Sequence, residues 1–242
     1  MPRKSRWTVP VPEVSIVTYV LGPAGAPLGK HETELAYADA EKPDTLFLTW
    51  GSFRLWSQRF AAGLIAAGLK PGERVLTFTP NDVFYPVVYM GICMAGGRFS
   101  PANAKFLPSE LAYQLKLVGA RFVLASDENV TAAVEAVGMV GMSRDSVFIF
   151  NDAPLGKEHG GEDDAKKGVR HWKHLLASKE EGAKFVWDDL KGEASKKATS
   201  GLVMSSGCVL TASLATDMAL LTRNHAERPA SPRPWTYRIT PL

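Results

Sequence analysis

Residues 72–100 read GERVLTFTPNDVFYPVVYMGICMAGGRFS, and this stretch indicates the fold more directly than any other. Within it, Arg74–Phe78 is a short and mainly apolar run that predicts a buried strand. Val83–Ala95 is apolar on almost every side, which is typical of a buried helix. A glycine pair ends that helix, and Arg98–Ser100 then predicts a second extended segment. The order of strand, helix and strand predicts a βαβ unit.

The segment before this unit predicts an amphipathic helix. Ser52 is expected to cap the helix, and Gly68 is expected to end it. The polar side chains of Arg54, Gln58 and Arg59 are expected to lie off the apolar face. Apolar side chains recur every three or four residues and form one stripe: Phe53, Trp56, Phe60, Leu64 and Ala67.

The alternation continues along the chain. Pro108 opens a further helix that Gly119 ends. Arg121–Ala125 and Val147–Phe150 read as strands on either side of a small helix over Asn129–Gly138. Strands that alternate with helices of this size predict the α/β class, with a parallel-rich sheet flanked by helices.

The composition is that of an ordinary globular chain. Of its 242 residues, 45% are hydrophobic and 22% are charged. The net charge of +3 is small and the basic residues are scattered, which argues against nucleic-acid binding. The two cysteines, Cys93 and Cys208, favour a reducing compartment over a disulfide framework.

No targeting signal is recognisable at either end. The basic N-terminus has no apolar run behind it, and the final Thr-Pro-Leu is not a peroxisomal signal of the Ser-Lys-Leu type. The longest apolar stretch, Val83–Ala95, is too short to cross a bilayer, so no membrane span is expected. These features predict a cytoplasmic protein.

The character of the sequence changes at Asn151. Lys, Glu, Asp and Gly dominate as far as Lys197, which predicts a solvated surface excursion that returns to the sheet at Gly201–Met204. Trp172, Leu175, Leu176 and Trp187 are expected to pin parts of it to the body. Three regions are expected: a disordered N-terminus over 1–10, a folded unit over 11–207, and a divergent tail over 208–242 that is disordered or forms one short helix.

Thr199–Gly207 has the character of a final strand that runs into a phosphate-binding loop. Ser205, Ser206 and Gly207 are the candidate binding residues, because backbone N–H groups and hydroxyls hydrogen-bond phosphate oxygens. Such a loop needs more Gly, Ser or Thr and a Lys, whereas this chain continues Cys-Val-Leu-Thr-Ala after Gly207. The alternative is a polar strand end solvated by water.

Other candidate sites are weaker. His171 and His174 lie three residues apart on an expected helix and could share a metal, but without a third ligand in register a solvated role is favoured. Cys93 is expected to be a packing residue in a buried helix. Cys208 has no histidine near it in sequence that would activate its thiol.

The order and spacing of several segments match those of a known family. They are Leu48-Thr-Trp50, Arg59–Gly63, Gly68–Val75, Pro80-Asn81, Tyr85-Pro86, Met94–Gly97, Ser100–Asn103, Glu110-Leu111, Gln114-Leu115 and Gly119-Ala120. Together they resemble the N-terminal region of adenylate-forming enzymes. The nearest group is the acyl- and aryl-CoA synthetases similar to 4-coumarate–CoA ligase, and the resemblance runs from about Val11 to Gly207.

The resemblance implies a fold and an activity. The family has a large N-terminal domain of packed α/β subdomains and a small mobile C-terminal domain. Its reaction uses ATP and Mg²⁺ to convert a carboxylic acid into an acyl-adenylate, and the thiol of CoA then displaces AMP. Ser205, Ser206 and Gly207 match the first three positions of the family's phosphate loop, Ser-Ser-Gly-Thr-Thr-Gly.

The sequence departs from the family after Gly207. The rest of the phosphate loop, the adenine and ribose contacts and the C-terminal lysine have no match, so no catalytic residue is assigned and no cofactor is expected to bind this chain. Ala104-Lys105 also stands where the branch usually has a proline. The expectation is a truncated synthetase that is inactive alone, with a longer parent that could carry a peroxisomal address. The alternative is a non-catalytic binding or regulatory fragment that associates with a full-length relative or another partner through an exposed apolar face.

Overall fold

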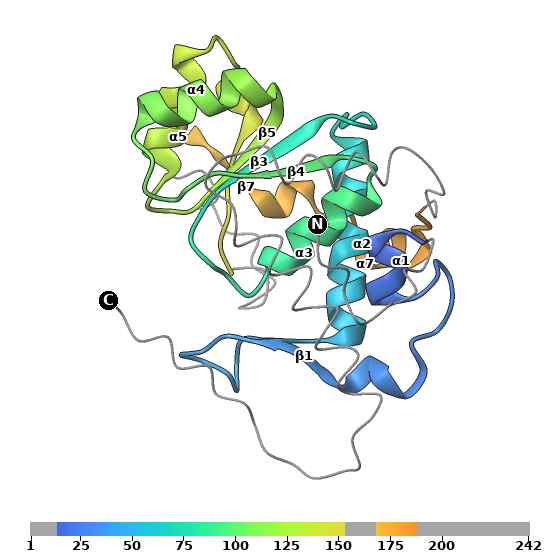
Figure 1. Cartoon of the computed structure of the whole chain (residues 1–242). Coiled ribbons are helices and arrows are strands. Elements are labelled where there is room, and N and C mark those ends of the chain that lie inside the picture. The colour runs from blue at the N-terminus through green and yellow to red at the C-terminus, as the bar shows by residue number, and fades with distance from the viewer. Residues whose placement is uncertain (1–13, 153–167, 188–242) are drawn as a thin grey trace, which may run out of the picture.

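The computed structural model describes residues 14–152 and 168–187 of the chain. The described elements alternate between helices and strands over most of this range (Figure 1). In chain order they are α1 (Ile16–Leu21), the 3-10 helix η1 (Gly29–Thr33), β1 (Leu35–Ala38), β2 (Phe47–Thr49), α2 (Trp50–Ala66), β3 (Arg74–Phe78), α3 (Tyr85–Met94), β4 (Arg98–Pro101), α4 (Pro108–Val118), β5 (Ala120–Ala125), α5 (Val130–Met139), η2 (Arg144–Ser146), β6 (Val147–Ile149), β7 (Arg170–His171), η5 (Trp172–Leu175) and α7 (Lys179–Lys184).

The main sheet of the described residues is parallel throughout. Its strand order is β4-β3-β5-β6-β7, and every neighbouring pair in that order runs parallel. The strand β3 therefore lies inside the sheet, with Leu76 paired to Ser100 of β4 on one side and to Val123 of β5 on the other. The predicted α/β class with a parallel-rich sheet is confirmed.

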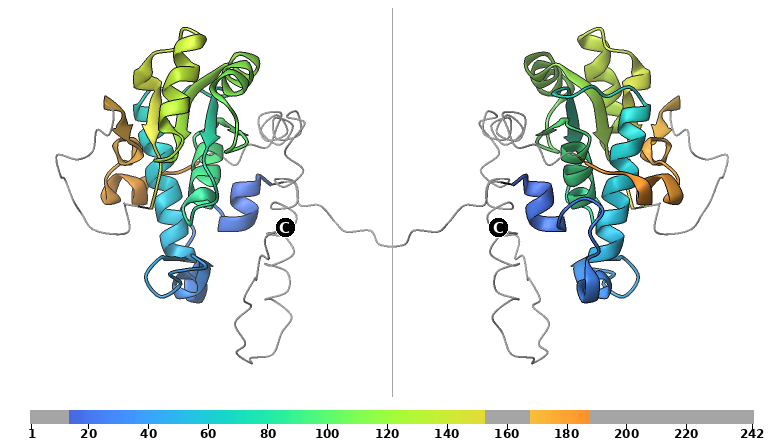
Figure 2. Two further views of the ribbon diagram at one scale, coloured as in Figure 1. Left: turned by 90° about the vertical axis from the view of Figure 1, so that its left-hand side faces the viewer. Right: turned by 90° about the vertical axis from the view of Figure 1, so that its right-hand side faces the viewer.

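Helices cover both faces of this sheet (Figures 1 and 2). Alternate strand residues enter opposite cores because successive side chains of a strand point to opposite faces. Val75, Leu124 and Phe148 join the core beneath α2 and α3, whereas the adjacent Leu76, Val123 and Val147 join the core beneath α4 and α5. Burial on both faces explains why these strands read as apolar runs rather than as alternating patterns.

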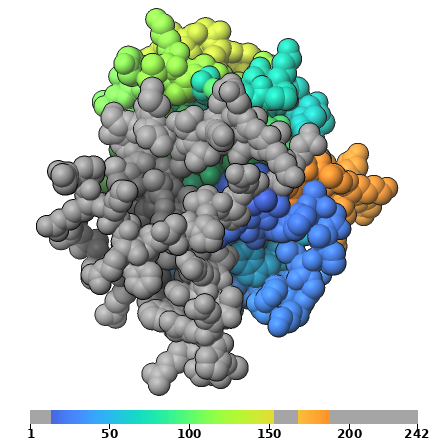
Figure 3. All heavy atoms as spheres, turned by 45° about the vertical axis from the view of Figure 1, so that its right-hand side comes forward, coloured from blue at the N-terminus to red at the C-terminus, as the bar shows by residue number. Residues whose placement is uncertain are grey.

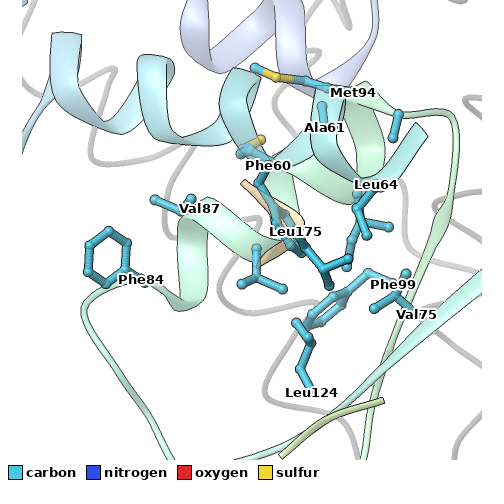
Figure 4. Close-up of a cluster of buried hydrophobic side chains, with 14 of the residues drawn as sticks. Phe60, Ala61, Leu64, Val75, Phe84, Val87, Met94, Phe99, Leu124 and Leu175 are labelled. Atoms are coloured by element: carbon cyan, nitrogen blue, oxygen red, sulfur yellow. The ribbon is translucent and has the colours of Figure 1, made fainter. Parts of the chain in front are cut away.

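The core beneath α2 and α3 is the larger of the two and is rich in aromatic rings (Figure 4). Phe60 of α2, Phe84 before α3 and Val75 of β3 are fully buried there. Gly91 of α3 lets the two helices approach, since a Cβ at this position would lie 2.9 Å from the Ser57 carbonyl oxygen. The close contact of α2 with α3 thus depends on a residue without a side chain.

The start of α2 differs from the sequence prediction. The N-cap is Thr49, whose Oγ1 accepts a hydrogen bond from the Ser52 backbone N–H at 3.2 Å. Ser52 occupies the third helical position, and its Oγ accepts from the Thr49 N–H at 2.8 Å. The two residues form a reciprocal capping box, so the helix begins three residues earlier than predicted.

The polar face of α2 also differs from the prediction. Arg54 and Gln58 were expected off the apolar stripe, but only 8% and 7% of their surfaces are exposed. Nη1 of Arg54 donates to the Ala26 carbonyl at 2.6 Å, and Nε2 of Gln58 donates to the Phe185 carbonyl at 2.8 Å. Ala67, by contrast, is exposed. The helix is buried on two sides because distant segments pack over its polar face.

One of those segments is residues 168–187, which we call the return segment. It was predicted to be part of a surface excursion that a few apolar side chains pin to the body, and its charged residues Lys179, Glu180, Glu181 and Lys184 are exposed. Arg170 and His171 form β7 at the edge of the sheet, where Ile149 pairs with His171. Trp172 is fully buried, and Trp187 is only 3% exposed. The predicted pinning by Trp172, Leu175 and Trp187 is confirmed.

The ring of Trp172 anchors the middle of the return segment. Its centroid lies 5.6 Å from that of Phe60, 5.4 Å from Phe84 and 5.0 Å from Phe150. At the end of the segment, Nε1 of Trp187 donates to Oγ1 of Thr18 in α1 at 3.1 Å. In the space-filling view the return segment accordingly lies beside the N-terminal elements (Figure 3). The Phe60 and Phe84 rings meet Trp172 edge to face, and aromatic pairs of that geometry each contribute about 0.5–1.5 kcal/mol beyond their burial.

Several sequence predictions fall outside the described residues. They are the disordered N-terminus over 1–10, the strand at Gly201–Met204, the phosphate-loop residues Ser205, Ser206 and Gly207, and the tail over 208–242.

Candidate functional site

The carboxyl edge of the parallel sheet is the part of the described fold where a site is expected. Ligands of open α/β sheets bind outside the carboxyl ends of the strands, where connections diverge to opposite faces. Here the connection from β3 leads to α3 on one face, and the connection from the neighbouring β5 leads to α5 on the other. The residues just after Phe78 and just after Ala125 therefore define the switch point.

Asp82 lies beyond the end of β3 and is mostly buried. Its Oδ1 accepts a hydrogen bond from the Phe84 N–H at 2.7 Å, directly before α3. Burial raises the pKa of Asp82 to about 6; the Phe84 hydrogen bond opposes this shift, and the carboxylates of Asp152 and Asp39 add to it. A carboxyl group thus titrates near neutral pH at the switch point.

A chain of hydrogen bonds links the ends of β5, β6 and β7. Nδ2 of Asn151 donates to Oδ2 of Asp127 at 2.7 Å, and Oδ1 of Asn151 lies 2.8 Å from Nε2 of His171. The Asn151 carbonyl oxygen also accepts from Nε1 of Trp172 at 2.9 Å. Asn151 therefore connects the sheet edge to the return segment through both its side chain and its backbone.

Two hydroxyls in the described part of the chain are buried without a hydrogen-bond partner. They are Oγ1 of Thr77, near the end of β3, and Oγ of Ser126, directly after β5. Ser126 shares the switch point with Asp82. An unpaired buried hydroxyl costs about 1–3 kcal/mol, so both are exceptions to the usual pairing of buried polar groups.

The charge of this edge limits the ligands it can hold. Asp82, Asp127 and Asp152 follow three neighbouring strands and bring carboxyl groups to one edge. Carboxylates repel phosphate, so a nucleotide placed here would need cations from another part of the protein. Among residues 14–152 and 168–187, no group of three His, Cys, Asp or Glu side chains is arranged to hold a metal ion. On charge, the carboxylates of this edge therefore do not fit the triphosphate of ATP.

The two histidine candidates are placed differently from each other. His171 ends β7 and caps the 3-10 helix η5, with only 6% of its surface exposed, so neither the expected helix nor the solvated role holds for it. Its Nδ1 accepts from the Lys173 N–H at 3.2 Å, so both ring nitrogens are occupied by protein groups. His174 is exposed in η5. A shared metal site for this pair has no support in the geometry.

Cys93 packs in α3, as predicted. Burial raises the pKa of its thiol to about 12, although a hydrogen bond with Tyr89 acts in the opposite direction. Such a thiol carries almost no thiolate at neutral pH and is a poor nucleophile. The residue has a packing role.

Comparison with known proteins places this fold in a family. The family model described as AMP-binding enzyme matches residues 29–204. Because the match covers most of the chain, the protein belongs to the AMP-binding enzyme family, and the resemblance to acyl- and aryl-CoA ligases is confirmed.

Relatives with curated names are CoA ligases. The chain is 28% identical over 170 residues to the phenylacetyl-CoA ligase epaB of Aspergillus niger, which covers 70% of this chain and 29% of that protein. It is 29% identical over 160 residues to a 4-coumarate–CoA ligase of Pinus taeda, covering 65% of this chain and 27% of the relative. The chain thus spans less than a third of the length of these relatives.

A solved structure confirms the fold. ATP-bound MatB from Rhodopseudomonas palustris superposes with a TM-score of 0.52 at 18% identity, over 72% of this chain and 29% of that one. At this identity the likeness concerns the fold alone. Within the described ranges, no helix is both long enough and apolar enough to cross a membrane.

Sequence reasoning did not identify the polar groups of the carboxyl edge as a set. A signal was available, because Asp82, Asp127 and Asn151 each come within four residues of the end of a predicted strand. The carboxyl ends of parallel strands meet at one edge, which would have placed these residues together. His171 gave no such signal, since β7 has only two residues.

Proposed function

We propose that this protein serves the ATP-dependent activation of a carboxylic acid and its transfer to CoA, as the N-terminal α/β part of an acyl- or aryl-CoA ligase. The observation that supports this proposal is the match to the AMP-binding family over residues 29–204, which includes all strands of the parallel sheet. The sheet would act as the scaffold against which the nucleotide-binding part packs. ATP, Mg²⁺ and CoA are the expected cofactors of the complete enzyme.

In this proposal the described residues hold no part of the triphosphate. The carboxyl groups of Asp82, Asp127 and Asp152 give the sheet edge the wrong charge for that role. Ser205, Ser206 and Gly207 are the residues that would contact phosphate, through backbone N–H groups and hydroxyl donors. The loop sequence after Gly207 supplies no lysine, so the 242-residue chain is proposed to be inactive by itself.

ATP–pyrophosphate exchange tests this proposal directly. The purified chain is incubated with ATP, Mg²⁺, labelled pyrophosphate and one acid at a time, namely phenylacetate, 4-coumarate, benzoate and a medium-chain fatty acid. A second chain carries the same residues 1–207 followed by a family continuation with Thr-Thr-Gly and Pro-Lys-Gly and the remaining domains. We expect exchange only from the extended chain, and its preferred acid would define the substrate class.

The matched control is the extended chain with the lysine of the restored loop replaced by methionine. Exchange that persists in this control would not come from the phosphate loop. Exchange by the 242-residue chain itself would contradict the proposed inactivity. An extended chain that folds but exchanges with no acid would contradict the proposed function.

The second candidate function is a non-catalytic fragment that associates with another protein. It is favoured by large apolar side chains on the outer face of α4, where Tyr113 is 72% exposed and Leu117 is 66% exposed. Sedimentation of the chain, alone and mixed with a full-length relative, tests this function. A complex that Leu117→Lys weakens and Leu35→Lys leaves intact would support it, because Leu35 is similarly exposed, at 62%, but lies on β1.

A further inference from the structure

Every strand of the parallel sheet has an arginine at or near its amino end. The arginine is the first residue of β3, β4 and β7, the second residue of β5, and lies three residues before β6. Parallel strands all begin at the same edge of a sheet, so the fold gathers cations that are far apart in the sequence. We call this set the arginine row, and in sheet order it consists of Arg98, Arg74, Arg121, Arg144 and Arg170.

The row is continuous in space. Arg74 and Arg98 are direct partners where β3 pairs with β4. At the other end of the row, Nη2 of Arg170 donates to the Asp145 carbonyl at 3.1 Å, which places Arg170 beside the 3-10 helix η2 that carries Arg144. Neighbouring strands lie about 4.8 Å apart, and β5 lies between the two groups. The positive charges therefore form one stripe along the amino edge.

Carboxylates of the described residues do not neutralise the row. Within residues 14–152 and 168–187, none of its guanidinium groups forms an ion pair. Arg121 and Arg170 instead lie over aromatic rings, at 5.4 Å from the centroid of Phe122 and 4.9 Å from that of Phe148. These rings support the side chains without cancelling their charge. Three members of the row are exposed, namely Arg121, Arg144 and Arg170.

Exposed apolar side chains and two lysines surround the row. They lie in the last turns of helices that lead toward the amino ends of strands, or in the turn that follows such a helix. Ile65 of α2 is 47% exposed, Leu117 of α4 is 66% exposed and Met139 of α5 is 55% exposed. Lys116 of α4 and Lys70, in the turn after α2, are exposed as well. Leu117 also belongs to the outer face of α4 described above.

The opposite edge of the sheet has the opposite charge. Asp82, Asp127 and Asp152 follow the carboxyl ends of three neighbouring strands. The net charge of +3 therefore conceals two edges of different sign, which an anionic surface would distinguish. The C-terminal carbonyl groups of α2, α4 and α5 carry partial negative charge at the amino edge, so an anion would be held there by side chains rather than by the backbone.

The mixture of cations and apolar side chains favours one class of anionic partner. Guanidinium groups hydrogen-bond the phosphates and carboxylates of anionic lipid headgroups. Apolar side chains beside them gain free energy by entering the boundary between headgroups and acyl chains. A nucleic acid would offer no such environment to Ile65, Leu117 and Met139, because its binding sites use aromatic rings that stack on bases.

We propose that the amino edge of the sheet binds the surface of an anionic lipid bilayer. The arginine row contacts the headgroups, and Ile65, Leu117 and Met139 reach the boundary of the acyl chains. Adjacent strands rotate by about 20–25°, but the longest strand of this sheet has six residues, so the edge curves little and long arginine side chains span the difference. The acidic carboxyl edge then faces away from the bilayer. This binding does not depend on catalytic activity of the chain.

Sedimentation of the full chain with lipid vesicles tests the proposal. One set of vesicles consists of phosphatidylcholine, and the other of equal parts phosphatidylcholine and phosphatidylserine. We expect binding to the anionic set alone, and weaker binding at physiological than at low ionic strength. Replacing both Arg121 and Arg144 by glutamine is expected to weaken binding roughly 25-fold, because each cation near an anionic surface strengthens binding about fivefold.

The matched control removes two positive charges elsewhere. Lys42→Gln combined with Lys105→Gln changes two exposed lysines outside the amino edge, and it should weaken binding less than about twofold. If the arginine variant does not fold, as judged by circular dichroism, Lys70→Gln combined with Lys116→Gln replaces it with the same expectation. Absence of binding to anionic vesicles would overturn the proposal. So would binding that is equally sensitive to the control pair.

A second pair of variants separates a lipid surface from other polyanions. Ile65→Gln combined with Met139→Gln keeps the charge of the edge and is expected to weaken vesicle binding at least about threefold. Binding of single-stranded poly-uridylate, measured by fluorescence anisotropy, should be weaker than vesicle binding and unaffected by this pair. Poly-uridylate that binds more tightly than anionic vesicles would assign the arginine row to nucleic acid and contradict the lipid assignment.

Discussion

Arg59 and Ala177 exchange two hydrogen bonds across 118 residues of sequence. Nε of Arg59 donates to the Ala177 carbonyl at 2.8 Å, and the Ala177 N–H donates to the Arg59 carbonyl at 3.0 Å. The Arg59 guanidinium also lies over the ring of Trp56, at 4.3 Å from its centroid. This pair attaches the return segment to the middle of α2. The same contact covers part of the polar face of the helix.

Replacing Arg59 by methionine tests the strength of this attachment. The variant keeps an apolar stem over Trp56 but leaves the Ala177 carbonyl without its side-chain donor, so we expect the free energy of unfolding to fall by about 1–2 kcal/mol. Urea denaturation measures the change. Lys116→Met on α4 removes an exposed charge and should shift the unfolding free energy by less than about 0.5 kcal/mol. Equal effects of the two substitutions would show that Arg59 acts only through its charge.

Gly63 is the position where α2 and the return segment come closest. A Cβ at Gly63 would overlap the backbone carbonyl group of Leu175, which is not the end of a flexible side chain. Gly63→Ala is therefore expected to cost more than about 3 kcal/mol, because either the return segment or α2 must move. Thermal unfolding and the near-ultraviolet signal of the buried Trp172 report this displacement.

The control for Gly63 is Gly138, near the end of α5. A Cβ there meets nothing within 4 Å. Gly138→Ala is expected to raise stability by up to about 0.5–1 kcal/mol, since alanine has the higher helix propensity. Destabilisation by both substitutions would mean that the tight contact at Leu175 does not cause the Gly63 effect.

The raised pKa of Asp82 predicts an unusual dependence of the free energy of unfolding on pH. Its folded pKa of about 6 lies above the ordinary aspartate value of 3.8, so the native state binds more protons than the unfolded state between these values. Burial of the ionised Asp82 carboxylate lowers the free energy of unfolding. This cost is absent below about pH 4, grows as pH rises, and is complete above about pH 6. The carboxyl group is partly solvated, so the penalty is on the order of 1–2 kcal/mol after screening.

Asp82→Asn checks this dependence. Asparagine keeps an oxygen that accepts from the Phe84 N–H but carries no charge. We expect the variant to be more stable than the unmodified chain at pH 8 and no more stable at pH 4. Asp44→Asn, in an exposed loop, is the control and should show no such difference. A pH-independent difference for Asp82→Asn would contradict the assigned pKa.

The Cys93 thiol is expected to be almost unreactive in the folded protein. With a pKa of about 12, its thiolate fraction at pH 8 is about a thousandfold below that of an unfolded cysteine. Labelling by iodoacetamide in a Cys208→Ser chain, with and without urea, measures the ratio. Comparable rates in the two conditions would show that the α3 environment does not protect the thiol.

Short-range patterns were sufficient to predict most regular elements. The strand at Arg74–Phe78, the helix ended by Gly119 and the strand at Val147–Phe150 were all identified within one or two residues. Gly119 has a φ of +59°, which is the left-handed conformation expected after a helix end. Each of these signals is carried by a few adjacent residues, so it is visible without the fold.

The candidate site could be predicted only in part. The Ser205–Gly207 loop was found from its residue types and lies outside the described residues, so it stays a prediction. The polar edge at Asp82 and Asn151 was missed because its residues meet only when β3, β5 and β6 lie side by side. No repeating pattern within a single segment indicates which residues of different strands come together in the fold.

The sequence by itself determined the α/β alternation and the family. Buried parallel strands must be continuously apolar, and helices need glycine, proline or capping residues at their ends, so both leave local marks. The place of the return segment, the burial of Arg54 and the burial of His171 were settled by tertiary contacts alone. These depend on contacts between residues that are far apart in the sequence: Arg59 and Ala177 are 118 positions apart, and Arg54 and Ala26 are 28 positions apart. These contacts stabilise the fold through hydrogen bonds between polar groups and carbonyl oxygens that are distant in the sequence. No pattern of neighbouring residues encodes such hydrogen bonds.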